Sequence, residues 1–307
     1  MISNKAKAHV ALLSMNIIYG ANYLIAKGLM PDKIEASALV FFRISIAGFL
    51  FLLLKLFIKE RIDKKDIPRF AICGLLGVAT NQFFSMNGLN LTSPVDAAII
   101  VTSMPIFTII ISYFLLKEPL TLPRIFGVSI GGSGAVLLIY LGNSGLGTGS
   151  LKGNIFIGIN ALAFAFYLVL IKPMMAKYKP ITVIIWTFLF GFIFMFPLCI
   201  DALLSTDFSS FETTHWMSIF YIVLGPTFLV YLLNLFALKH VKPTVSGSYV
   251  YVQPAIAMLL VASIAYFIPN SQYQGDITVA KLLCCVLIFI GVYLISSTDS
   301  LKWLRRK

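Results

Sequence analysis

The chain has 307 residues, of which 59% are hydrophobic and only 12% are charged. Soluble domains carry about 25% charged residues, so an ordinary soluble fold is excluded. The formal net charge of +12 does not indicate a nucleic-acid partner, because the basic residues lie between apolar runs and not along one folded surface. The composition therefore predicts a chain that lies almost entirely in membrane lipid.

Ten apolar runs follow one another along the chain, separated by charged residues, proline or glycine. An α-helix rises about 1.5 Å per residue, so about 20 apolar residues cross a hydrocarbon layer roughly 30 Å thick. We therefore expect an all-α membrane protein with ten transmembrane helices. These run over Val10–Met30, Ala36–Ile58, Phe70–Leu91, Pro94–Leu116, Ile125–Leu141, Ile155–Met175, Ile181–Ile200, Met217–Leu238, Thr244–Ile268 and Lys281–Ser296.

The distribution of lysine and arginine predicts the orientation of these helices. Basic residues are retained on the cytoplasmic side of a membrane. With a cytoplasmic N-terminus, 19 of the 24 Lys and Arg residues fall on that side, while the opposite loop from Asp201 to His215 has three acids and no Lys or Arg. The sequence thus predicts a multi-pass protein of the cell inner membrane with both termini cytoplasmic.

A weak internal repeat divides the chain into two halves. A shift of 149 residues superposes three prolines, Pro31 on Pro180, Pro94 on Pro243 and Pro105 on Pro254. A shift of 144 residues superposes Asn16 on Asn160 and Tyr23 on Tyr167. We expect a first five-helix repeat over 1–143, a flexible connection over 144–152, a second repeat over 153–298 and a basic cytoplasmic tail over 299–307.

Five helices per repeat have a consequence for topology. Because five is an odd number, the second repeat begins on the opposite side of the membrane, so the two repeats are inverted. Inverted repeats around a central cavity are typical of alternating-access transporters. The pattern therefore predicts a secondary transporter of a small-molecule substrate, with membrane lipid as its surroundings.

Several local patterns resemble the EamA family of the drug/metabolite transporter superfamily, and the resemblance covers essentially the whole chain. The patterns are Tyr19-Gly20-Ala21-Asn22, Arg43, Thr92-Ser93-Pro94, Pro105, Leu116-Lys117-Glu118-Pro119-Leu120-Thr121, Gly134-Ala135-Val136, Val241-Lys242-Pro243, Pro254 and Gly291-Val292. The chain departs from the family where a glutamate usually follows the ninth helix, since Phe267 leads into Ile268-Pro269-Asn270. The resemblance implies export or exchange of amino acids, related metabolites or drugs, and it names no single substrate.

Polar residues inside the apolar runs outline a candidate substrate cavity, because polar groups in lipid are costly unless they are paired or face water. Helical spacing places several of them on shared faces. The predicted cavity residues are Asn16, Tyr23, Asn81, Gln82, Ser103, Asn160, Tyr167, Tyr231, Asn234, Tyr251 and Gln253. The alternative for the asparagines is that they only hydrogen-bond between helices.

Two basic residues and two prolines are candidates for gating or clamping. Lys27 either gates or extends to the outer interface. Arg43 lies deeper, so we expect it to pair with an acid such as Asp96 or Glu35; facing the cavity instead, it would favour substrates with a carboxylate. Pro105 and Pro254 each free a backbone carbonyl, which kinks a helix or binds substrate.

Other functions fit the sequence less well. No metal cluster, catalytic motif or cofactor-binding motif is present, and the three histidines lie at helix ends or in loops, which argues against an enzyme. The open alternative is a lipid or lysolipid translocase, because phenylalanine-rich runs such as Phe188–Phe196 could line a lateral opening. A proton is a candidate coupling ion, although no unpaired carboxylate marks a relay.

Overall fold

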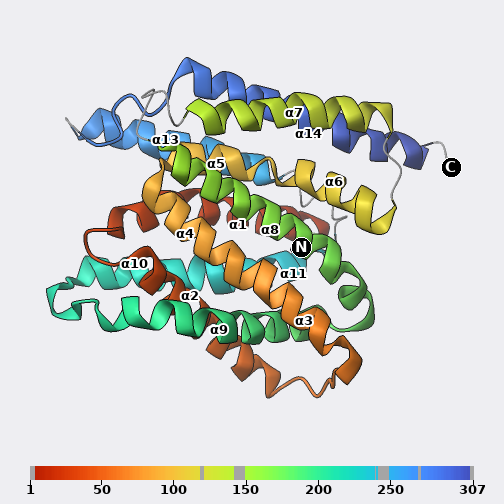
Figure 1. Cartoon of the computed structure of the whole chain (residues 1–307), viewed down its shortest axis with the longest axis horizontal. Coiled ribbons are helices and arrows are strands. Elements are labelled where there is room, and N and C mark those ends of the chain that lie inside the picture. The colour runs from red at the N-terminus through yellow and green to blue at the C-terminus, as the bar shows by residue number, and fades with distance from the viewer. Residues whose placement is uncertain are drawn as a thin grey trace.

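Every regular element that the computed structural model describes is a helix. The model describes residues 4–117, 121–141, 149–238, 240, 249–268 and 271–304. Helices predominate because lipid offers no hydrogen-bond partners, so each backbone group must bond within its own segment. Figure 1 shows the result, a bundle whose helices mostly run along its long axis.

The first half of the chain forms seven α-helices and two tighter or wider turns. In chain order these are α1 (Asn4–Leu29), α2 (Ala36–Lys55), the 3₁₀ turn η1 (Lys64–Asp66), α3 (Ile67–Gly74), the π-helical turn η2 (Leu75–Thr80), α4 (Asn81–Leu91), α5 (Pro94–Val101), α6 (Met104–Leu116) and α7 (Leu122–Leu141). Helices α3, η2 and α4 are continuous and together cover the predicted run Phe70–Leu91.

The second half repeats this order. Its elements are α8 (Leu151–Lys177), α9 (Pro180–Leu204), the 3₁₀ turn η3 (Phe208–Ser210), α10 (Thr213–Val223), the π-helical turn η4 (Leu224–Leu229), α11 (Val230–Leu238), the 3₁₀ turn η5 (Tyr249–Tyr251), α13 (Val252–Phe267) and α14 (Val279–Leu304). The predicted tail from residue 305 onward and the connection over 142–148 lie outside the described residues.

Eight helical segments in the described ranges are long and apolar enough to cross a membrane. Each of these eight coincides with one of the predicted runs. The two other runs are helical as well, as α3–η2–α4 and as α14, in which the apolar stretch is the shorter Val279–Leu294. The chain is therefore a multi-pass membrane protein, and the count of ten spans stays a prediction.

The two π-helical turns lie at the same relative place in the two halves. They begin at Leu75 and Leu224 and end at Thr80 and Leu229, so both ends differ by 149 residues. The first elements follow the other shift, because η1 begins at Lys64 and η3 at Phe208, 144 residues apart. The predicted registers thus apply to different parts of the chain.

One proline match is wrong as a structural correspondence. Helix α2 begins at Ala36 and α9 at Pro180, so these helix starts differ by 144 residues and not by 149. Pro180 opens α9, where the missing amide costs no hydrogen bond. Pro31, in contrast, lies in the turn before α2. Its superposition on Pro180 is a coincidence of sequence.

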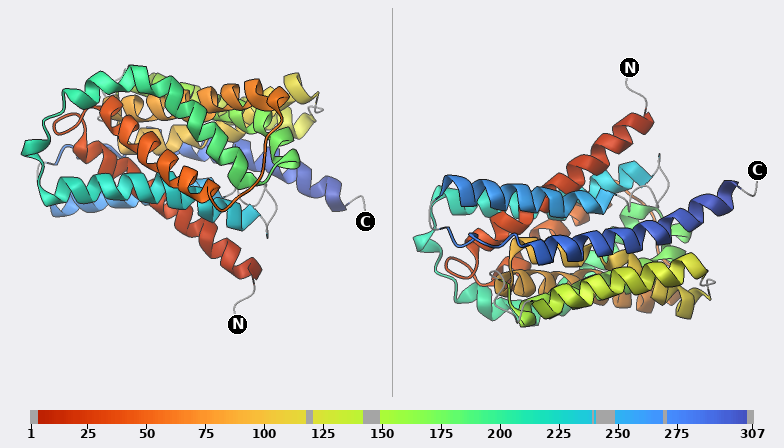
Figure 2. Two further views of the ribbon diagram at one scale, coloured as in Figure 1. Left: turned by 90° about the horizontal axis from the view of Figure 1, so that it is seen from below. Right: turned by 90° about the horizontal axis from the view of Figure 1, so that it is seen from above.

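Helices α7 and α14 pack side by side along one edge of the bundle, as Figures 1 and 2 show from three directions. Glycines allow this close approach. A Cβ atom added to Gly291 would lie 2.5 Å from the Cα and N atoms of Gly131 and 2.6 Å from the carbonyl oxygen of Gly127. The two backbones therefore touch directly, with no room for a side chain between them.

The remaining contacts place four helices around the centre of the bundle. Helix α1 packs against α11 and α13, α8 packs against α4 and α6, and α2 packs against α9. In each case a helix of one half contacts helices of the other half or of the neighbouring layer. Figure 2 also shows the first turns of α1 extending beyond the rest of the bundle.

Candidate functional site

A cavity of about 380 Å³ lies in the centre of the bundle, between helices of both halves. Its walls come from α1, α2, α4, α5 and α6 of the first half and from α8, α11, η5 and α13 of the second. The polar side chains that line it are Asn16, Tyr19, Asn22, Tyr23, Arg43, Asn81, Gln82, Ser85, Asn160, Tyr231, Asn234 and Gln253. Concave sites with a few placed polar groups are where small molecules bind.

Eight of the eleven predicted cavity residues line this cavity. They are Asn16, Tyr23, Asn81, Gln82, Asn160, Tyr231, Asn234 and Gln253. Their helical faces were placed by spacing alone, and the tertiary packing brings those faces together. Contact with a substrate stays a prediction for each of them.

Three predicted cavity residues lie elsewhere. The ring of Tyr167 packs over Gly77, where an added Cβ would lie 2.3 Å from it. Ser103 is 1% exposed, and its hydroxyl donates to the carbonyl of Ile100. The ring of Tyr251 packs against Phe289, with ring centres 4.6 Å apart. The structure therefore corrects the prediction for these three residues.

A chain of hydrogen bonds joins α1 to α13 across the cavity wall. Nε2 of Gln253 donates to Oδ1 of Asn16 over 2.9 Å, and the Tyr23 hydroxyl donates to Oε1 of Gln253 over 3.1 Å. Asn16 in turn donates to the carbonyl of Leu12. All three side chains are at least nine-tenths buried, so each bond is shielded from water.

Arg43 lines the cavity and does not pair with either predicted acid. Its Nε atom donates to Oγ1 of Thr227 over 2.9 Å, and its Nη1 atom lies 3.2 Å from the sulfur of Met86. Thr227 belongs to the π-helical turn η4, which turns this hydroxyl toward α2. The expectation of an Arg43 ion pair with Asp96 or Glu35 is therefore wrong.

Lys27 lies near the end of α1 but does not extend to the outer interface. Its Nζ atom donates to the carbonyls of Leu89 over 3.1 Å and Asn90 over 2.6 Å, in the last turn of α4. These carbonyls have no helical partner and carry the negative end of the helix dipole. Lys27 thus ties α1 to α4, which agrees with a clamp.

The prolines lie next to breaks in their helices. The predicted run Pro94–Leu116 is interrupted at Thr102 and Ser103, and Pro105 stands in the first turn of α6. Pro254 stands in the first turn of α13, directly after η5. Because a helix start needs no amide hydrogen there, both prolines are accommodated without losing a bond. Their part in gating stays a prediction.

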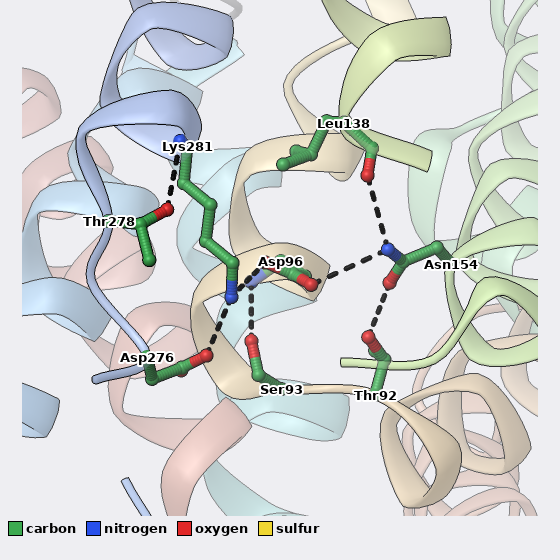
Figure 3. Close-up of polar contacts among 8 residues, drawn as sticks. All are labelled: Thr92, Ser93, Asp96, Leu138, Asn154, Asp276, Thr278 and Lys281. Atoms are coloured by element: carbon green, nitrogen blue, oxygen red, sulfur yellow. Dashed lines mark hydrogen bonds and ion pairs between the residues drawn. The ribbon is translucent and has the colours of Figure 1, made fainter. Parts of the chain in front are cut away.

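A second polar group, which we call the Asp96 cluster, was not found from the sequence. It comprises Thr92, Ser93, Asp96, Asn154, Asp276 and Lys281 (Figure 3). The Nζ atom of Lys281 lies 2.7 Å from Oδ1 of Asp96 and 2.7 Å from Oδ1 of Asp276, and these three side chains are at most 2% exposed. The cluster joins α5 to α14, one helix from each half.

Amides and hydroxyls complete the Asp96 cluster. Nδ2 of Asn154 on α8 lies 3.4 Å from Oδ2 of Asp96 and 3.3 Å from the carbonyl oxygen of Leu138 on α7, while the Thr92 hydroxyl donates to Asn154 Oδ1 (Figure 3). None of the cluster residues lines the central cavity. One signal could have revealed the pair: both Asp96 and Lys281 are charged residues at the edge of an apolar run.

No group of three or more His, Cys, Asp or Glu side chains in the described ranges is arranged to hold a metal ion. The four cysteines, all within those ranges, are buried and free. Neutral amides, phenols and hydroxyls, with Arg43, therefore supply the chemistry of the central cavity. Such groups bind and orient a solute without forming or breaking its covalent bonds.

Comparison with known proteins agrees with this arrangement. The model of the EamA-like transporter family matches residues 6–140 and 151–297, which is nearly the whole chain. The uncharacterized transporter YetK of Bacillus subtilis is 25% identical over 85% of this chain and 80% of its own length. The uncharacterized transporter YdfC of the same organism is 31% identical over 72% of each chain.

A plant relative and a solved structure extend the likeness. The WAT1-related protein At3g18200 of Arabidopsis thaliana is 26% identical over 96% of this chain and 82% of its own. One protein of known crystal structure superposes with a TM-score of 0.61 at 17% identity, over 94% of this chain and 97% of the other, which shows a shared fold. On the match over both halves, this chain belongs to the EamA-like transporter family.

Proposed function

We propose that the chain is a secondary transporter that moves small metabolites by alternating access, as an exporter or exchanger of amino acids and related compounds. The observation that carries the proposal is the central cavity, whose walls come from both halves of the chain. A cavity at the interface of two repeated units can be exposed to either side when the units rock against each other. Its amides and phenols suit a polar solute.

The proposal includes two inverted five-helix repeats in the inner membrane, with both termini cytoplasmic. The matching π-helical turns support the repeat, because both begin and end 149 residues apart. The separate matches of the family model to residues 6–140 and 151–297 support the division near residues 143–153. The distribution of Lys and Arg supports the orientation.

A lipid or lysolipid translocase is a second candidate, favoured by one feature. A hollow of about 540 Å³ lies between α1, α10 and α13 and the segment after α13, lined in part by Leu24, Ile25, Leu29 and Ile264. An apolar hollow of this kind suits an acyl chain better than a zwitterion. The test of function should therefore include lysolipids beside water-soluble metabolites.

The deciding experiment is counterflow of radiolabelled amino acids into proteoliposomes that contain the purified protein. Saturable uptake, competed by unlabelled substrate and absent from protein-free vesicles, is the expected result. Repeating the assay with and without a pH gradient asks whether protons drive net transport. Uptake of lysophospholipid alone would favour the second candidate, and an inactive but folded protein would contradict both.

A further inference from the structure

Arg43 is a buried guanidinium that faces the central cavity. It is 3% exposed and stands eight residues into α2. A charge at this depth is costly and persists only with partners or with a function. The partners that the structure supplies for Arg43 are therefore informative about what else it binds.

Those partners leave its charge uncompensated. Its contacts are the Thr227 hydroxyl and the sulfur of Met86, both neutral. The ionisable groups that face it are the phenols of Tyr19, Tyr23 and Tyr231. No Asp or Glu is among the described residues that line the cavity. The acid that the sequence offered, Asp96, is paired with Lys281 instead.

The guanidinium also has donors to spare. It carries five N–H groups in a planar fork, of which the contact to Thr227 uses one and the contact to the weakly accepting thioether uses another. Three N–H groups remain, enough for the bidentate pair that arginine forms with a carboxylate. Thr227, which also donates to the carbonyl of Ile222, holds the fork in one orientation.

The second half does not supply a matching charge. At the shift of 144 residues that relates α2 to α9, the position of Arg43 corresponds to Thr187. Thr187 is 1% exposed, and its hydroxyl donates to the carbonyls of Val183 and Ile184 in its own helix. The cavity thus has a single cationic anchor on one wall.

We propose that Arg43 binds the carboxylate of the transported substrate, so that the protein accepts small carboxylic acids and amino acids and rejects organic cations. The inference rests on the proposed transport function and narrows its substrate class. A cation would meet an uncompensated positive charge in the cavity and no carboxylate there to balance its own. A carboxylate would instead complete the coordination of the guanidinium.

The test uses three compounds that share one side chain: an L-amino acid, its 2-oxo acid and its decarboxylated amine. Each competes with the labelled amino acid for counterflow into proteoliposomes of the wild-type protein. We expect the amino acid and the oxo acid to compete, and the amine not to compete at a tenfold higher concentration. Competition by the amine as strong as by the acid would overturn the inference.

Variants give a second line of evidence. Arg43→Gln should lower counterflow of the amino acid at least tenfold, and Arg43→Lys should retain an intermediate rate, because lysine keeps the charge without the fork. The control is Arg69→Gln, since Arg69 donates to the carbonyl of Leu170 away from the cavity and should transport normally. Equal rates for Arg43→Gln and Arg69→Gln would contradict the proposal.

The outcomes separate this inference from the proposed function. A wild-type protein that transports nothing contradicts the transport function and the inference with it. A wild-type protein that transports amines as well as acids leaves the transport function standing and removes the role of Arg43. If Arg43→Gln does not fold, the competition pattern of the wild-type protein still decides the question.

Discussion

Gln253 on α13 and Asn16 on α1 form a hydrogen bond of 2.9 Å although 237 residues separate them. The same Gln253 amide accepts from Tyr23, so one side chain bridges two turns of α1. At the shift of 149 residues, Gln253 corresponds to Met104, which lines the cavity from α6. A thioether there cannot make the bonds that the amide makes.

Gln253→Met should therefore weaken both structure and transport. Each lost hydrogen bond costs about 0.5–1.5 kcal/mol, and the buried Asn16 amide is left without its donor. We expect a lower melting temperature in detergent and slower counterflow. Tyr167→Phe is the control, because Tyr167 lies outside the cavity and its loss should leave counterflow unchanged. Normal transport by Gln253→Met would show that the bridge has no part in substrate handling.

The Asp96 cluster predicts an order of stabilities. Lys281→Met leaves two buried carboxylates without their cation, whereas Asp96→Asn leaves Lys281 paired with Asp276 over 2.7 Å. Removing one partner of a buried ion pair costs about 3–5 kcal/mol, so the lysine variant should melt at the lower temperature. Lys177→Met, at a half-exposed surface pair, is the control and should melt near the wild-type temperature. The reverse order of the first two variants would contradict this account of the cluster.

The contact between α7 and α14 predicts different effects for two neighbouring positions. Gly291→Ala places a methyl group 2.5 Å from the backbone of Gly131, so the helices must separate and the variant should be destabilised by about 1–3 kcal/mol. Gly132 has open space around its Cβ position. Gly132→Ala should therefore be neutral or gain up to about 1 kcal/mol from helix propensity. Thermal unfolding of both variants checks the contrast, which fails if they behave alike.

A loop contact predicts a dependence of stability on pH. Hydrogen bonds from Lys177 and then Tyr178, each 2.6 Å long, hold the pKa of Asp66 below its usual range. A carboxyl with a lowered folded-state pKa stabilises the fold above its unfolded value near about 4, and this contribution is lost as pH falls through the folded-state pKa. Wild type should melt above Asp66→Asn at pH 7, and the gap should close in that acid range.

The size of this gap should also fall in high salt, because the contact is partly exposed. Asp32→Asn, which removes an exposed acid in the turn before α2, is the matched control and should show no such gap at any pH. A gap for Asp66→Asn that persists unchanged into strong acid would mean that the effect is steric and not electrostatic.

The positions of the helices could be predicted because lipid forces the backbone to satisfy its own hydrogen bonds over runs of about 20 residues. The break beside Pro105 followed from the missing amide of proline. The π-helical turns could not be predicted, since hydropathy does not distinguish an α-turn from a wider one. They matter for the site, because η4 presents Thr227 to Arg43.

Partners distant in the chain were the main failure. Tyr23 and Tyr167 are equivalent by register, yet Tyr23 meets Gln253 while Tyr167 fills the space that Gly77 leaves beside it. Asp96 was offered to Arg43, but it pairs with Lys281, which the sequence placed in an outer loop. Local spacing tells which face of a helix a residue occupies, and only the packing of α5 on its neighbours tells what that face meets.

The bridge at Gln253 has a consequence for the working cycle. Separating α1 from α13 breaks two hydrogen bonds, whereas separating α8 from α6 at the Met104 position disrupts apolar contacts. At about 1 kcal/mol per bond, the two movements differ by about 2 kcal/mol, or roughly thirtyfold in equilibrium population. The two doors of the carrier are therefore unequally sprung, and the resting molecule waits for its cargo with the α1–α13 door closed.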